Sequence, residues 1–100
     1  MGKRKLIWSP QSKIDLFEVM DFYRNRNGNS TYSLKLYANI KNLLERCKSY
    51  SFIGRKTDYE NVRVLIADDY LVFYEVADSE IRVLTIRSAK QNPKTLNIKR

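Results

Sequence analysis

The chain has 100 residues, 43% of them apolar, and a formal net charge of +8 at pH 7. Its length and apolar content are those of a small folded unit with its own core, and they exclude a disordered chain. One cysteine and no histidine exclude an internal disulfide, a Ser–His or Cys–His catalytic pair and any histidine-containing metal site. We expect one domain over residues 1–100, with no metal and no cofactor.

The charge and the start of the chain indicate its surroundings. A small basic domain typically meets a polyanion, an acidic protein partner or an anionic surface. No apolar run approaches the roughly 18–20 residues that span a bilayer. The basic residues at positions 3–5 are not followed by the apolar region of a secretory signal. We therefore expect a cytoplasmic protein that has no membrane partner.

The first elements are a short strand and a helix. Residues 5–8, Lys-Leu-Ile-Trp, predict a strand at an edge of the sheet, where lysines protect it from further pairing. Ser9 and Pro10 predict a helix start, because serine caps a helix N-terminus and proline fits its first turn. Gly28 ends this helix, since glycine readily takes the left-handed conformation. The predicted apolar stripe comprises Ile14, Leu16, Phe17, Met20 and Tyr23.

A second helix is predicted from Ser30 or Thr31. Its apolar residues recur at the spacing of one helix face, and they are Leu36, Tyr37, Ile40, Leu43, Leu44 and Cys47. The intervening turn is so short that the two helices must form an antiparallel hairpin. Cys47 lies on the apolar stripe, so we expect a core thiol rather than a nucleophile.

Three runs rich in β-branched and aromatic residues follow a connector at residues 50–61. They predict a three-stranded antiparallel meander over residues 62–87, with Asp68 and Asp69 as ordinary turn residues. Both faces of the middle run, residues 70–76, are partly apolar, which indicates the central strand. We predict an α+β fold in which an N-terminal helical hairpin packs on a small, mainly antiparallel sheet, in the order β-α-α-β-β-β.

The candidate functional residues are mainly basic, with aromatic residues between them. This combination suits a nucleic acid or an acidic protein surface. Arg63 and Arg87 lie on the strands that flank the middle strand, and we expect them to bracket one face or groove of the sheet. The candidate target-binding residues are Arg55, Lys56, Arg63, Tyr70, Tyr74, Arg87, Lys90 and Lys94.

Plainer interpretations of these cations stay open. The segment Gly54-Arg55-Lys56 either presents backbone amides and cations to a phosphate or forms an ordinary exposed loop. Arg82 is expected to pair with acidic residues of neighbouring strands. For Arg87 and Lys90 the functional and the plain interpretation are balanced, because no acidic residue follows them.

The order of these segments resembles the RelE/ParE superfamily, the toxins of bacterial type II toxin–antitoxin pairs. The resemblance is carried by Ile7-Trp8-Ser9-Pro10, Gly54-Arg55, Val62-Arg63-Val64-Leu65, residues 70–76 and the closing segment Lys90-Gln91-Asn92-Pro93. It implies a cognate antitoxin that binds through an apolar and acidic segment. Such a segment suits a binding partner with the net charge of +8 that this chain carries.

The superfamily has two functional branches on one fold. RelE-like members are ribosome-dependent nucleases that cut mRNA, and ParE-like members poison DNA gyrase. RelE-like nucleases often carry an arginine after the aromatic residue that opens the middle strand, where this chain has Leu71 after Tyr70. They often place a tyrosine or histidine after the last strand, and this chain has neither there. The resemblance therefore favours a ParE-like toxin that acts on DNA gyrase.

Two alternatives remain. The first is a RelE-like endoribonuclease acting on the ribosome and mRNA, with Arg63, Arg87 and Lys90 as catalytic residues and Arg55 and Lys56 as supporting cations. The second is an inactive basic binding module that only docks an antitoxin.

Overall fold

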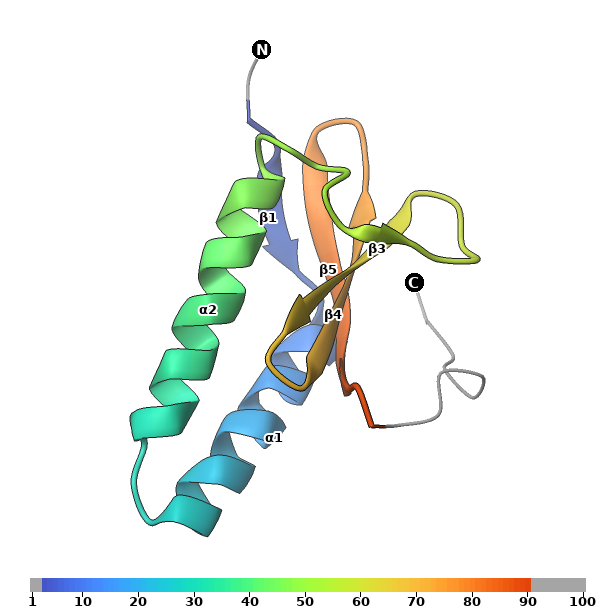
Figure 1. Cartoon of the computed structure of the whole chain (residues 1–100). Helices are drawn as coiled ribbons and strands as arrows, with labels where there is room; N and C mark the ends of the chain where they lie inside the picture. The colour runs from blue at the N-terminus through green and yellow to red at the C-terminus, as the bar shows by residue number, and fades with distance from the viewer. Residues whose placement is uncertain (1–2, 91–100) are drawn as a thin grey trace.

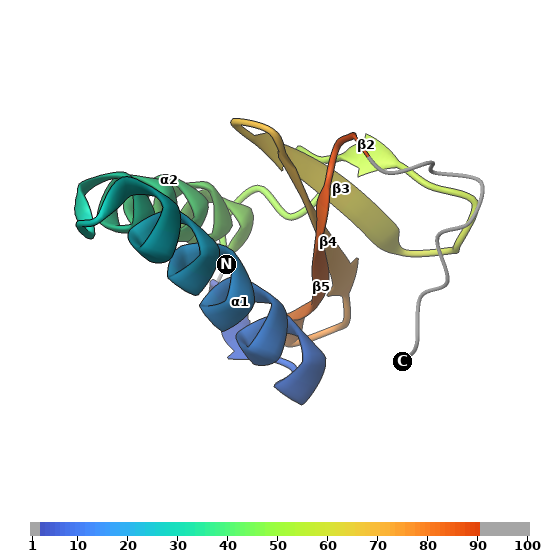
Figure 2. The same cartoon turned by 90° about the horizontal axis from the view of Figure 1, so that it is seen from below.

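The computed structural model describes residues 3–90 of the chain. Its elements are β1 (Lys5–Trp8), α1 (Pro10–Asn27), α2 (Thr31–Cys47), β2 (Arg55–Lys56), β3 (Val62–Ala67), β4 (Tyr70–Val76) and β5 (Glu80–Ser88). The two helices lie together on one face of the sheet (Figure 1, Figure 2). This arrangement confirms the predicted α+β fold. No helix within residues 3–90 has the length and apolar content of a membrane span.

The sheet order is β1-β5-β4-β3-β2. All neighbouring strands run antiparallel except β1, which pairs with β5 in parallel. The meander β3-β4-β5, the central place of β4 and the edge place of β1 are therefore confirmed. The structure adds β2, a two-residue strand at the opposite edge that the sequence analysis did not predict.

The core lies between the sheet and α2. Leu36, Ile40, Leu44 and Cys47 of α2 are fully buried, as their spacing predicted. They form one cluster with side chains from the helix-facing side of the sheet, which are Leu65, Ala67, Val72, Tyr74, Val76, Ile81, Val83 and Ile86. Burial raises the pKa of the Cys47 thiol, so this cysteine is a core residue rather than a nucleophile.

The ends of α1 agree with the prediction. Ser9 Oγ accepts a hydrogen bond from the Ser12 N–H at 3.1 Å, which caps the helix N-terminus. Gly28 has a φ of 73° at the C-terminal cap, the left-handed conformation that favours glycine.

The predicted apolar stripe of α1 is wrong at two positions. Ile14 and Phe17 are 52% and 66% exposed. The face that packs against the core carries Leu16, as predicted, together with Val19, and Ser12 is fully buried. Helical spacing places Ile14 and Phe17 on a face that no element within residues 3–90 covers.

A β-bulge in β5 fastens the start of α1 to the sheet. The register between β4 and β5 shifts so that Leu84 is an extra residue. Ser9 Oγ donates a hydrogen bond to Leu84 O at 3.0 Å. Asp15 Oδ2 accepts from Thr85 Oγ1 at 2.5 Å and from the Ile86 N–H at 3.1 Å. These bonds fix the position of α1 beside β5.

Tyr74 of β4 joins the connector to the core. Its side chain is completely buried. Its hydroxyl donates to Ser51 O at 2.8 Å and accepts from the Gly54 N–H at 3.0 Å. A Cβ added at Gly54 would lie 2.7 Å from Tyr74 Oη and 2.9 Å from Val64 O. Neither neighbour can move freely, so glycine is the residue that fits here.

Replacing Gly54 by alanine is expected to lower the free energy of unfolding by roughly 1–3 kcal/mol, because overpacking forces a buried ring or a backbone carbonyl to move. Urea denaturation followed by circular dichroism measures the change. Ser49→Ala, at an exposed position nearby, is the control and should stay within about 0.5 kcal/mol of the parent chain. A Gly54→Ala variant as stable as this control would contradict the close packing.

Candidate functional site

The predicted site residues fall into two groups on different elements. β2 and β3 carry Arg55, Lys56 and Arg63, whereas Arg87 lies on β5 and Lys90 follows it. Arg63 and Arg87 line different hollows. The prediction that these two arginines bracket one groove is therefore wrong. Lys94 lies outside the described residues.

Arg55, Lys56 and Arg63, which we call the connector cations, lie close together. Antiparallel pairing places Lys56 directly opposite Arg63, and Arg55 precedes Lys56 on the exposed strand β2. Lys56 and Arg63 line a hollow of about 360 Å³ together with Asp58 and Glu60 of the following turn. The positive charge of this group is therefore bordered by acidic residues.

Arg63 is held in place by the connector. Its Nη1 donates to Gly54 O at 3.1 Å and to Phe52 O at 3.4 Å. Its guanidinium carbon lies 5.0 Å from the centroid of the Phe52 ring, within the range of a cation–π interaction. Arg63 thus stabilises the connector in addition to presenting charge, and the sequence analysis did not predict this contact.

The two tyrosines predicted as target-binding residues have other roles. Tyr74 is fully buried, so its prediction as a target-binding residue is wrong. Tyr70 is half-buried, and its hydroxyl donates to Tyr23 Oη at 3.2 Å. The Tyr23 ring also contacts Tyr32, with centroids 4.5 Å apart. This tyrosine cluster ties the start of β4 to both helices.

Arg87 lies near the end of β5, where it lines a groove with residues of α1. With the exposed ring of Phe22 it lines a groove of about 440 Å³, which we call the α1–β5 groove. Asp15 and Glu18 of α1 line the same groove. Positive, negative and aromatic groups therefore meet in one place. Such a mixed surface suits a protein target better than a continuous phosphate backbone.

The remaining cations are Arg82 on β5 and Lys90 after its end. Lys90 is exposed, and its N–H donates to Ser88 Oγ at 3.2 Å. Arg82 pairs with Glu75 at 3.3 Å and with Glu80 at 2.7 Å, which confirms the expected pairing with neighbouring acids. Arg82 therefore stabilises the sheet through ion pairs and is not a candidate for binding a target.

Burial raises the pKa of the Tyr74 hydroxyl well above its ordinary value near 10. Because the folded state holds this proton more tightly than the unfolded state, the stabilisation is complete below about pH 10 and is lost as the pH rises above it. Urea unfolding between about pH 9 and pH 11 should show a falling free energy of unfolding. The fall should be shallower in Tyr74→Phe, and equal slopes in the two proteins would contradict this coupling.

The comparisons with known proteins identify a family through a family model and a fold through solved structures. The chain matches a family described as the ParE toxin of the type II toxin–antitoxin system parDE, over residues 6–93. It is similar to a chain of the chromosomal ParDE system from P. aeruginosa, with 22% identity and a TM-score of 0.73 over 86% of this chain and 96% of that one. A chain of the E. coli DinJ–YafQ toxin–antitoxin complex is similar at 12% identity and a TM-score of 0.57, over 86% and 92%. No curated protein matches.

Proposed function

This chain belongs to the ParE toxin family of type II toxin–antitoxin systems, and from this premise we propose that it arrests growth by binding DNA gyrase and is neutralised by a cognate antitoxin. The observation that carries the proposal is the family match over residues 6–93. We propose the cytoplasm as the place of action, because bacterial DNA and its gyrase are there.

The described residues support binding rather than RNA cleavage. General acid–base catalysis needs a side chain that exchanges protons near the working pH and reaches the substrate. The chain has no histidine, and Tyr74 is buried. Burial and the hydrogen bond with Tyr23 raise the pKa of Tyr70. Leu71 packs beside the buried Phe73, so an apolar contact stands where RelE-like nucleases often carry an arginine.

We assign gyrase binding to the α1–β5 groove. An exposed aromatic ring beside an arginine is a typical anchor of protein interfaces, and Phe22 and Arg87 provide this pair. The hydrogen bonds of Ser9 and Asp15 to the bulge of β5 hold α1 in place. The groove therefore exists before a target binds, which reduces the entropic cost of association.

A RelE-like mRNA endonuclease is the second candidate, and one observation favours it. Lys56 and Arg63 share a hollow with the carboxylate-bearing residues Asp58 and Glu60. A carboxylate can accept a proton while cations stabilise the charge that develops on a phosphate. Arg87, however, lines the α1–β5 groove. The described residues therefore do not bring together the catalytic residues that the sequence analysis proposed for a nuclease.

Cleavage assays with purified gyrase and with purified ribosomes distinguish these two candidate functions. In a reaction with gyrase, ATP and supercoiled plasmid, the chain is expected to produce linear DNA after detergent and protease treatment, and none without gyrase. Reporter mRNA on purified ribosomes should stay intact under the same conditions. Cut mRNA with unchanged plasmid would establish the nuclease instead. No effect in either assay would leave the inactive binding module.

Arg87→Ala is expected to lower gyrase-dependent DNA cleavage by about tenfold or more, the loss of an interface anchor worth about 1.4 kcal/mol. Its free energy of unfolding should change by no more than about 1 kcal/mol, because Arg87 is half-exposed. Arg24→Ala is the matched control, since Arg24 is exposed and pairs with Asp21 of its own helix. Full activity of Arg87→Ala would show that the groove is not the gyrase site.

A further inference from the structure

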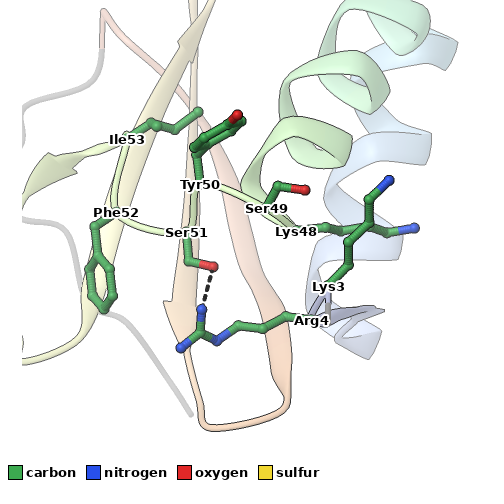
Figure 3. A pocket seen from close by; sticks show the side chains of 8 residues that line it. All are labelled: Lys3, Arg4, Lys48, Ser49, Tyr50, Ser51, Phe52 and Ile53. Carbon is green, nitrogen blue, oxygen red and sulfur yellow. Dashed lines mark hydrogen bonds between the residues drawn. The ribbon is translucent and has the colours of Figure 1, made fainter. Parts of the chain in front are cut away.

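A hollow of about 500 Å³ opens where the residues before β1 meet the end of α2 and the connector. We call it the N-terminal pocket, and the lining residues that matter here are Lys3, Arg4, Lys48, Tyr50, Phe52 and Ile53. Figure 3 shows the two lysine side chains on one side of Ser51 and the ring of Phe52 on the other. Cations and apolar groups thus meet from two distant parts of the sequence.

Arg4 is a fixed part of this pocket. Its Nε donates to Ala77 O at 2.8 Å. Its Nη1 donates to Ser51 Oγ, also at 2.8 Å (Figure 3). Its backbone N–H donates to Lys48 O at 3.0 Å. Ser51 is buried and donates in turn to Cys47 O at 2.8 Å. The pocket is therefore preformed, so a ligand does not have to order it.

The cations of the pocket are only partly neutralised. Lys48 pairs with Glu45 at 3.0 Å. No ion pair within residues 3–90 joins a carboxylate to Lys3 or Arg4. Glu45 therefore borders the cluster with one negative charge, whereas the guanidinium of Arg4 bonds to a backbone carbonyl and a hydroxyl. The result is a short positive cluster, which suits a few carboxylates of a partner.

The connector adds exposed apolar surface to this charge. Tyr50, Phe52 and Ile53 are 68%, 50% and 46% exposed. Apolar residues gathered in this way mark a site of interaction. Ile53 has no ring on which a base could stack, and the guanidinium of Arg63 already lies over the Phe52 ring. Aliphatic and aromatic side chains of a peptide fit this surface better than nucleic-acid bases.

We propose that the N-terminal pocket binds an acidic, amphipathic segment of the cognate antitoxin. Carboxylates of the segment lie toward Lys3, Arg4 and Lys48, and its apolar side chains cover Tyr50 and Phe52. A nucleic acid needs a continuous basic track because its charge repeats at every nucleotide, and this cluster is short. The inference rests on the proposed neutralisation by an antitoxin, and it adds the place and the chemistry of docking.

The charged half of the proposal is tested by calorimetric titration of the full chain with the antitoxin encoded beside its gene. The pocket variant is Lys3→Glu with Lys48→Glu, and Arg4 is left intact because it holds the fold. The matched control is Lys13→Glu with Lys41→Glu, two exposed lysines of the helices. The pocket variant is expected to bind about 10- to 100-fold more weakly than the parent, and the control less than about threefold more weakly.

The apolar half is tested in the same titration. Tyr50→Ser with Phe52→Ser is expected to weaken antitoxin binding by about tenfold or more, because it removes two aromatic anchors. Ile14→Ser with Phe17→Ser is the matched control, since these side chains are equally apolar and exposed but lie on α1. Thermal unfolding of all variants confirms that each is folded before it is titrated.

Each outcome bears on a different claim. If the antitoxin does not bind the parent chain, the proposed neutralisation fails, and this inference fails with it. If all variants bind as tightly as the parent, or if controls weaken as much as pocket variants, the pocket is not the docking site and the proposed function stands. If the pocket variants lose affinity for an oligouridine RNA and keep their affinity for the antitoxin, the pocket is a nucleic-acid site and the inference is overturned.

Discussion

The hydroxyl of Tyr74 is the contact on which the connector depends. It joins the central strand to Ser51 O and the Gly54 N–H, and both bonds are buried. Leaving such groups unpaired costs about 1–3 kcal/mol each, so the core dictates the path of the connector. That path sets the carbonyls that hold Arg63 and brings Phe52 under its guanidinium. A buried tyrosine thus shapes an exposed basic and aromatic surface.

A second constraint acts where the start of α1 meets β5. The bulge of β5 places Leu84 O and the Ile86 N–H where Ser9 and Asp15 of the α1 segment can bond to them. These bonds fix α1 beside Arg87 and create the α1–β5 groove. The N-terminal pocket and this groove therefore arise from different contacts. In our proposals they serve different partners, the antitoxin and gyrase, which allows each surface to be altered without the other.

The sequence predicts the periodic parts of this fold well, because α2 and the meander repeat apolar residues with the period of their own element. β2 has two residues and therefore no period. Ile14 and Phe17 have helical spacing, but spacing identifies a face and does not say what covers it. Arg63 and Arg87 lie on the predicted strands, yet their side chains line different hollows. Tyr74 alternates with buried valines along β4, and this signal could have identified it as a core residue.

Hydrogen exchange followed by mass spectrometry tests most directly whether two preformed surfaces serve two partners. The chain is measured alone, with its antitoxin and with gyrase. We expect the Gly54 amide to exchange slowly in the free chain, because it is bonded to Tyr74. The antitoxin should slow exchange in residues 48–56, and gyrase in residues 84–90. Rapid exchange at Gly54 in the free chain, or protection of the same segment by both partners, would contradict this division.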